Sequence, residues 1–189
     1  MPHLNARIES LGLIESTLWN ELAQASRERE HPWRVLALAT LETSSEGIRA
    51  AARSVVLREA RPEQHQLLFY TDTRSPKVHQ LRQQPQGTLL AWSATLGWQL
   101  RLEVDMGVAD SGLDVSSRWA RVKLSPGAQD YLAALPPGTP VDRYEPERGS
   151  RAHFGVVTAQ VSAIDWLELH ADGHRRARFD EQGGRWLAP

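Results

Sequence analysis

Apolar residues recur at helical spacing near the start of the chain. Ile8, Leu11, Ile14, Leu18 and Leu22 are three or four positions apart, which places them on one face of a helix. The pattern therefore predicts an amphipathic helix over about residues 8–30. We expect this helix to end at the His-Pro pair that follows, because the residue before a proline is excluded from the helical region.

Shorter apolar segments rich in β-branched and aromatic residues come next, and Gly, Pro, Asp and Ser separate them. This composition is typical of strands joined by turns. We expect strands over 33–43, 48–60, 65–72, 87–94 and 98–110, with a hinge at Gly97. Two further segments, 152–173 and 174–188, close the chain as strands, and Asp172-Gly173 is typical of the hairpin turn between them.

Three helical patterns interrupt the strands, and the last two follow each other directly. Residues 75–84 predict a short helix that stops at Pro85, residues 111–124 a second, and residues 125–135 a third that starts with a Ser-Pro cap. The proline-rich stretch 136–150 is expected to be a loop. Strands and helices do not alternate strictly, which argues against a doubly wound sheet. The pattern favours a mainly β fold with flanking helices (α+β), built as a small barrel of six or more mostly antiparallel strands.

The composition excludes several classes of function. With 189 residues the chain suits one compact domain, and a net charge of −1 gives no field that would favour nucleic acid. The absence of cysteine excludes disulfides and thiolate sites, and the seven histidines show no metal-ligand spacing, so we expect no metal. The N-terminal residues lack the order of a signal peptide, in which a basic region precedes an apolar one. No apolar run approaches the roughly 20 residues needed to span a bilayer. We therefore expect a cytoplasmic protein without a membrane partner.

The stretch "YTDTRSPK" (70–77) is where a predicted strand meets a predicted helix. Ser75 suits an N-cap and Pro76 the first helical position. Lys77 is unusual there, because the positive end of the helix dipole disfavours a cation in the first turn. A bound phosphate would reverse that preference. The alternative is a plain capped helix on the surface.

Two other strands carry candidate polar residues. Arg53 and Arg58 flank "SVVL" and are an odd number of positions apart, so they should project from opposite faces of one strand. Arg53 interrupts an apolar strand, where arginine either reaches solvent at an edge or clamps an anion such as phosphate. In "GWQLRLEV", Gln99, Arg101 and Glu103 share one face. That face is either half-solvated or, through Gln99, able to bond the polar edge of a ring.

Taken in order, "RSVVLR", "LLFYTDTRSPK" and "GWQLRLE" resemble the FMN site of the pyridoxamine 5'-phosphate oxidase-like flavoproteins. The resemblance runs from about Trp33 to the C-terminal "GGRWLAP". It implies a split β-barrel that binds FMN, as a single domain over 1–189 with an N-terminal helix in 1–31 and a helical and loop insertion over 111–152. It also implies a homodimer with FMN at the interface of the two subunits.

The same resemblance assigns roles to individual residues. It implies that Arg53, Ser75 and Lys77 hold the phosphate of FMN, that the strand backbone after Arg53 lines the flavin ring, and that Gln99 meets the ring. Trp166 is only the nearest candidate for the family's late tryptophan, because the segment aligns with a gap. The full cofactor-binding set is Arg53, Ser54, Val55, Val56, Leu57, Arg58, Tyr70, Thr71, Ser75, Lys77, Gln99, Trp166 and Arg178.

The chain departs from the family pattern mainly on the substrate side. Pro76 stands where an arginine often precedes the lysine, although Arg74 upstream is a possible substitute. The family's arginine-x-histidine pair is reversed to His174 and Arg176, and its tyrosine-arginine-serine grip on a substrate phosphate maps loosely onto Trp119, Lys123 and Ser125. The substrate-binding candidates are Arg58, Lys123, His174 and Arg176, and no side chain is assigned a catalytic role.

The resemblance thus implies an FMN-dependent oxidoreductase. A small amine or phosphorylated substrate would pass a hydride to the flavin, and the electrons would go on to oxygen or another acceptor. The alternative is an FMN-binding protein without turnover that serves flavin storage or sensing. Related split barrels bind a deazaflavin or haem, and the sequence leaves these cofactors open.

Overall fold

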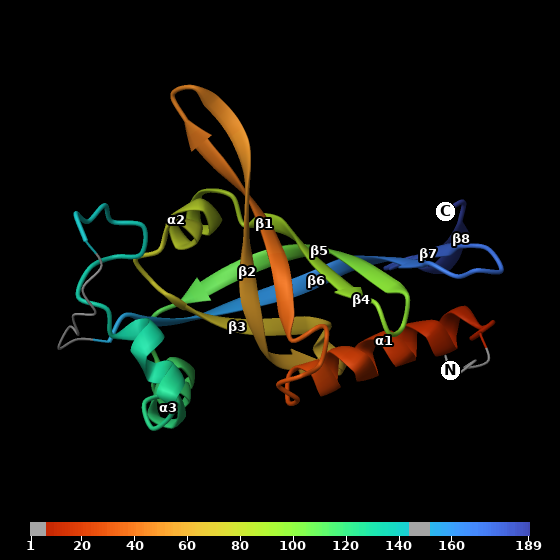
Figure 1. Ribbon diagram of the computed structural model, residues 1–189, viewed down its shortest axis with the longest axis horizontal. Helices are drawn as coiled ribbons and strands as arrows, with labels where there is room; N and C mark the ends of the chain where they lie inside the picture. Colours follow the sequence, from red (N-terminus) through yellow and green to blue (C-terminus); the bar gives the residue numbers. More distant parts are fainter. Residues whose placement is uncertain (1–6, 144–151) are drawn as a thin grey trace.

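The computed structural model describes residues 7–143 and 152–189. Within these ranges lie three α-helices, two short 3-10 helices and eight strands (Figure 1). The helices are α1 (Leu11–Ala25), α2 (Pro76–Gln83) and α3 (Leu113–Val122), with 3-10 helices η1 (Pro62–Gln64) and η2 (Pro126–Tyr131). The strands are β1 (Val35–Ser44), β2 (Gly47–Arg61), β3 (Gln66–Asp72), β4 (Gln86–Ser93), β5 (Trp98–Ala109), β6 (Phe154–Glu168), β7 (Arg175–Asp180) and β8 (Gly183–Leu187).

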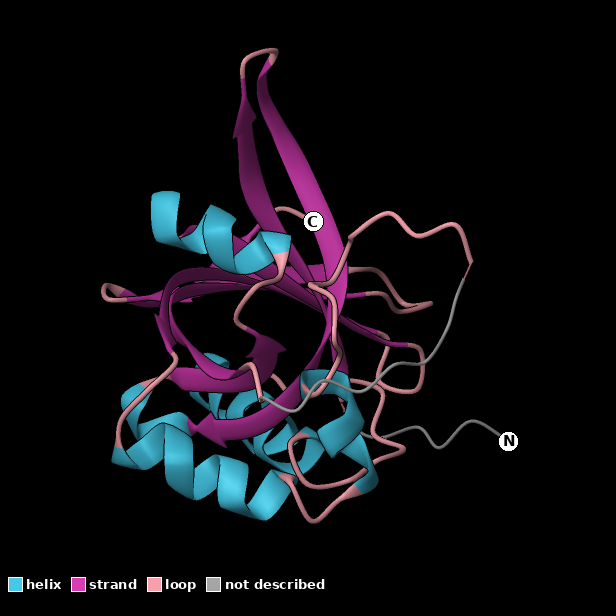
Figure 2. Ribbon diagram, turned by 90° about the vertical axis from the view of Figure 1, so that its left-hand side faces the viewer, coloured by secondary structure: helices cyan, strands magenta, loops and turns pink. Residues whose placement is uncertain are grey.

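The eight strands form one antiparallel sheet in the order β3-β2-β1-β4-β5-β6-β7-β8. The first half of β6 also pairs with β3, from Phe154 to Gln160, and this closes six strands into a ring. The second half of β6 pairs instead with β7, from Ala163 onward. The ring is seen end-on in Figure 2, with one helix above it and the other helices below it. The fold is the expected split barrel, mainly antiparallel and flanked by helices.

The core fills the ring and extends under α1. Ile14, Leu18 and Leu22 of α1 are fully buried, as the helical spacing predicts. They join Leu38, Leu57 and Leu100 from the strands in one cluster. Burying a leucine side chain contributes roughly 1.5–3 kcal/mol, so this helix face fixes α1 to the barrel. A second cluster outside β3 and β6 unites Leu68 and Val156 with Val115 of α3 and Tyr131 of η2.

Strands β1 and β2 form a hairpin that projects well beyond the ring (Figure 1). Its alternation is clean along β1, where Leu36 and Leu38 are buried while Val35 is 51% exposed. The outward face of β1, β2 and β4 carries Val35, Leu41, Ile48, Val56, Leu90 and Trp92, each at least 36% exposed. The register pairs Val35 with Val56 and Ala37 with Leu90, so the exposed side chains of the three strands lie on one outward face.

Two helices and one strand differ from the predictions. The N-terminal helix ends at Ala25 rather than near residue 30, and the guanidinium of Arg34 binds the carbonyls of Ala25 and Ser26. The helix expected over 125–135 is only the 3-10 turn η2. The last predicted strand is divided into β7 and β8 by a turn at Glu181 and Gln182. Residues 1–6 and 144–151 of the two predicted flanking segments lie outside the described residues.

The sequence predicts no segment that spans a membrane. None of the helices in residues 7–143 and 152–189 is long and apolar enough to span a bilayer.

Candidate cofactor site

A cleft of about 220 Å³ lies where β2 and β3 meet α2 and η2. Seven of the residues predicted to bind the cofactor line it, together with side chains from η2 and the loop that follows. The lining residues are Ser54, Val55, Val56, Arg58, Tyr70, Thr71, Asp72, Lys77, Asp130, Tyr131 and Pro137. The structure therefore brings together segments that are about 20 and 75 positions apart in the sequence.

One end of the cleft is a triangle of two hydroxyls and an ammonium group. The Nζ of Lys77 lies 3.0 Å from Thr71 Oγ1 and 3.1 Å from Ser75 Oγ, and the two hydroxyl oxygens are 3.2 Å apart. Ser75 occupies the N-cap position of α2 as predicted, but its hydroxyl makes no capping hydrogen bond. The hydroxyl accepts from Lys77 instead, so the three polar groups meet at the start of α2, where the helix dipole is positive.

Arg53 lies on the adjacent strand and adds a second cation. Its guanidinium donates to Gln80 Oε1 at 2.8 Å and to the hydroxyl of Thr40. Gln80 and Thr40 are both buried and neutral, and they bond each other at 2.7 Å. Arg53 faces the interior with Val55 and Leu57, whereas Ser54 and Val56 face outward. This alternation confirms the predicted strand, and Arg58 follows at a bulge in the β2–β3 register.

The electrostatics of this end favour an anion. Burial lowers the pKa of Lys77, the charge of Arg53 lowers it further, and only the carboxylate of Asp72 acts in the opposite direction. Asp72 is itself bound by Arg74, whose guanidinium and backbone N–H donate to both carboxylate oxygens. Among the described residues, neither Lys77 nor Arg53 has an ion pair with a carboxylate. Two cations held by neutral oxygens leave a charge that a dianion would balance.

Arg74 does not replace the cation missing at Pro76. Besides binding Asp72, its guanidinium donates to the carbonyls of Ala133 and Ala134 in the segment after η2. Its role in the structure is to tie this segment to the start of α2. The cations at this end are therefore Lys77, which lines the cleft, and Arg53, which lies beside it.

The other end of the cleft is built around Arg58. Its guanidinium carbon lies 5.7 Å from the centre of the Tyr70 ring, within range of a cation–π contact. Tyr131 from η2 lies beside it, and although burial raises the pKa of Tyr131, the charge of Arg58 lowers it in part. The Nε of Arg58 is buried and has no hydrogen-bond partner in the described part of the chain. Such a donor is costly to leave unpaired.

The remaining predicted cofactor residues do not reach this cleft within one chain. Gln99 and Arg178 lie on the outward face of β5 and β7, and β1 and β4 separate β5 from β2 around the ring. Arg178 is engaged by both oxygens of Glu103 at 2.8 Å and by Asp180 at 3.0 Å. Trp166 does not lie with them: it is fully buried, edge-on to Trp98. The residue of β6 that pairs with both Gln99 and Arg176 is Leu167.

The predicted substrate-binding residues are also spread over the surface. Arg176 is bound by Asp165, which also accepts from Arg101 at 2.8 Å. His174 is exposed in the turn between β6 and β7. Lys123 is exposed at the end of α3, and the hydroxyl of Ser125 donates back to the carbonyl of Val122 at 2.7 Å. Of the four candidates, only Arg58 lines the cleft.

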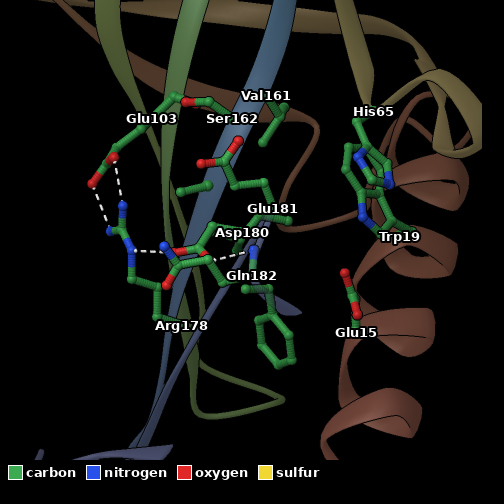
Figure 3. A pocket seen from close by; sticks show the side chains of 13 residues that line it. Glu15, Trp19, His65, Glu103, Val161, Ser162, Arg178, Asp180, Glu181 and Gln182 are labelled. Atoms are coloured by element: carbon green, nitrogen blue, oxygen red, sulfur yellow. Dashed lines mark hydrogen bonds and ion pairs between the residues drawn. The ribbon is translucent and has the colours of Figure 1, made fainter. Parts of the chain in front are cut away.

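A larger cavity of about 480 Å³ lies elsewhere, at the split of the barrel (Figure 3). It opens where β6 leaves β3 for β7, and α1 covers it with Trp19, which stacks on His65 at 5.2 Å. Glu15, Glu103, Asp180 and Glu181 line it, and Arg178, the one arginine or lysine among its described lining residues, is already paired. This lining would repel a phosphate, so the smaller cleft is the better cofactor site.

A comparison with protein families matches residues 16–110, half of the chain, to the pyridoxamine 5'-phosphate oxidase FMN-binding domain. The matched range contains the Lys77 triangle, Arg53 and Arg58. The chain belongs to this family. The recognition made from the three strand and helix motifs is thereby confirmed. Among proteins with curated functions, none matches the chain at a significant level.

Several solved structures share the fold of this chain. A pyridoxamine 5'-phosphate oxidase-related, FMN binding protein from Nostoc punctiforme has a TM-score of 0.69 at 22% identity, over 97% of this chain and all of that one. PhzG from Burkholderia lata, solved with tetrahydrophenazine-1-carboxylic acid, has a TM-score of 0.71 at 17% identity, over 100% and 97%. Campylobacter jejuni ChuZ has a TM-score of 0.57 at 15% identity, over 96% and 65%.

Sequence reasoning missed three residues of this family member's site. Thr40 and Gln80 hold Arg53, and Tyr131 forms the wall beside Arg58. Gln80 was within reach of the sequence, because it lies one helical turn after Lys77 and so shares its side of α2. Thr40 and Tyr131 had no such signal, because their proximity depends on strand pairing and on the position of η2.

Proposed function

We propose that the protein binds FMN with its phosphate at the Lys77 end of the cleft and acts as an FMN-dependent oxidoreductase. The observation that supports this most directly is the Lys77–Thr71–Ser75 triangle with Arg53 beside it. Its donors are two cations, two hydroxyls and a helix N-terminus, which is the donor set that a phosphate dianion prefers. The family match covers the same residues.

Different residues of the site would bind the phosphate and the ring of FMN. Lys77, Ser75, Thr71 and Arg53 would hold the phosphate, and the outward backbone and side chains from Ser54 to Val56 would line the ring. When bound, FMN would supply hydride acceptance and transfer of electrons to oxygen or another acceptor. The protein then needs to position the substrate and exclude water, and needs no nucleophile of its own.

We further propose that the protein acts as a homodimer whose interface completes the site. The outward apolar face runs from Val56 beside the cleft, across Val35 and Leu90, to Trp92 beside Gln99. A large exposed apolar face is typical of an interaction surface. In a two-fold dimer each end of such a face meets the opposite end of its copy. The β5–β7 end, with Gln99 and Arg178, would then lie over the other subunit's cleft, which one chain cannot achieve.

The test is the visible spectrum of the purified protein, followed by mass spectrometry of the extracted cofactor. We expect a flavin spectrum and the mass of FMN, with one FMN per chain and a dimeric mass in solution. A deazaflavin or haem in the extract would reject FMN as the cofactor. A preparation that stays colourless and takes up no added FMN would reject the whole proposal. Bound FMN without turnover of any amine or phosphorylated substrate would favour a storage or sensing role.

A further inference from the structure

One wall of the cofactor cleft is formed by η2 and the loop that follows it. Asp130, Tyr131 and Pro137 line the cleft from this side. Tyr131 is buried in the apolar cluster outside β3 and β6, whereas residues 134–143 are all exposed. Apolar burial therefore fixes the start of the wall but contributes little to the position of Pro137. Polar contacts have to hold that part of the wall.

Arg74 makes such contacts from the loop before α2. Its guanidinium donates to the carbonyls of Ala133 at 2.8 Å and Ala134 at 3.2 Å, and at 3.4 Å to that of Leu135. One side chain can bind consecutive carbonyls in this way because a guanidinium carries several N–H donors in one rigid plane. Arg74 thus joins the exposed part of the wall to the loop that begins α2.

Asp72 orients the guanidinium of Arg74. The side chain of Asp72 is 3% exposed. Its carboxylate accepts from two guanidinium nitrogens of Arg74, at 2.7 and 3.1 Å, and from the backbone N–H of Arg74 at 2.8 Å. A two-pronged pair of this kind fixes the direction of the planar group. Arg74 also balances the charge of Asp72, which lines the cleft and acts on Lys77.

We infer that Arg74 is a positioning residue that retains the bound flavin, because it holds the wall with Tyr131 and Pro137 closed over the cleft. This inference rests on the proposed function, which places the flavin in that cleft. Arg74 is not among the described residues that line the cleft, so it acts through the wall. Its contacts with the wall and with Asp72 lie within one chain, so they stand whatever groups a second subunit adds.

The test compares the release of FMN with that of riboflavin, which has no phosphate, from the full-length protein. Release after rapid dilution is followed by flavin fluorescence. Arg74→Lys keeps a positive charge for Asp72, but one ammonium cannot bind the carboxylate and the carbonyls together. Both flavins should leave about 10-fold faster, as expected for lost hydrogen bonds to a charged group. The two factors should agree within about twofold.

Arg74→Ala removes the partner of Asp72 as well as the contacts with the wall. Riboflavin should again leave at least about 10-fold faster. FMN should be accelerated more than riboflavin, because the unbalanced carboxylate of Asp72 then opposes the phosphate.

Hydrogen exchange of the cofactor-free protein separates the wall from a general loss of stability. Arg74→Lys should speed the exchange of amides in residues 130–140 and leave the amides of β4 and β5 unchanged. Arg82→Lys is the matched control, because Arg82 belongs to the adjacent helix α2 and pairs with Asp110 at 2.8 Å on the surface. This control should change neither flavin release nor exchange, as befits an exposed pair.

Several results would overturn the inference. Unchanged riboflavin release in both Arg74 variants would show that the wall does not retain the flavin. Faster release of FMN alone would show that Arg74 acts on the phosphate through charge. Faster exchange across the whole sheet would show that Arg74 only stabilises the fold. An unmodified protein that binds neither flavin would reject the proposed function, whereas unchanged release from a protein that binds both would reject this inference alone.

Discussion

Replacing Lys77 by methionine tests the phosphate site through two opposite effects. Lys77→Met keeps most of the side-chain length and removes the ammonium group that lies 3.0 and 3.1 Å from two hydroxyls. In the FMN complex that group would make a hydrogen bond between two charges. Bonds of this kind contribute about 1.5–3 kcal/mol. FMN should therefore bind about 10- to 150-fold more weakly, whereas riboflavin, which has no phosphate, should change by less than about twofold.

The same substitution should not destabilise the protein without cofactor. The folded-state pKa of Lys77 is lowered by burial and by Arg53. A lowered lysine pKa means that the protonated form is disfavoured on folding, so the cost is fully present below the folded pKa and is lost only as pH rises from there to the unfolded pKa. At neutral pH the variant lacks this cost. Its melting temperature without FMN should equal or exceed that of the unmodified protein, as expected where a functional charge lowers stability.

The assay is fluorescence titration of FMN and of riboflavin, with thermal unfolding of the cofactor-free protein. Arg82→Met is the matched control, because Arg82 lies in the last turn of the same helix and pairs with Asp110 at 2.8 Å on the surface. It should change neither ligand's affinity by more than about twofold, as befits an exposed pair. Equal losses for FMN and riboflavin in Lys77→Met would show that Lys77 does not contact the phosphate. A clear fall in melting temperature would refute the electrostatic argument.

Three further predictions concern the dimer, the ion-pair network and the barrel. Leu90→Glu on the apolar face should give a monomer by light scattering and reduce FMN uptake, whereas Leu113→Glu on α3, 90% exposed, should leave the dimer intact. Burial raises the pKa of Glu168, but hydrogen bonds from Arg175, Arg7 and Trp98 lower it more, so the stabilisation that Glu168 contributes is lost as pH falls below about 4.5. In urea titrations at pH 7, Glu168→Gln should lower the free energy of unfolding by about 3 kcal/mol. The stability of the variant should also depend less on pH in the acid range. A Cβ at Gly87 would lie 2.7 Å from the carbonyl oxygen of Ala39, so Gly87→Ala should cost about 1–3 kcal/mol of unfolding free energy, while Gly107→Ala, with open space around it, should be nearly neutral.

The sequence by itself determined the elements and the chemistry of one end of the site. Periodicity placed the buried face of α1 and the strands, because side-chain burial follows directly from a repeat of 3.6 or 2 residues. It failed at the end of α1 and at η2, where a tertiary contact from Arg34 and a proline-rich segment decide the boundary. Ser75 and Lys77 were found because they are two residues apart, and local spacing fixes their proximity.

Only the tertiary structure decided what surrounds those residues. The closing of the ring by β3 and β6, the bulge at Arg58 and the position of η2 bring Thr40, Gln80 and Tyr131 to the cleft. These contacts join residues far apart in the chain, and no periodic pattern encodes which strand face meets which helix end. The same applies to Trp166, which shares a strand with outward-facing residues but turns into the core. Side-chain direction at such a position depends on strand register, and register is fixed by the packing of the whole barrel.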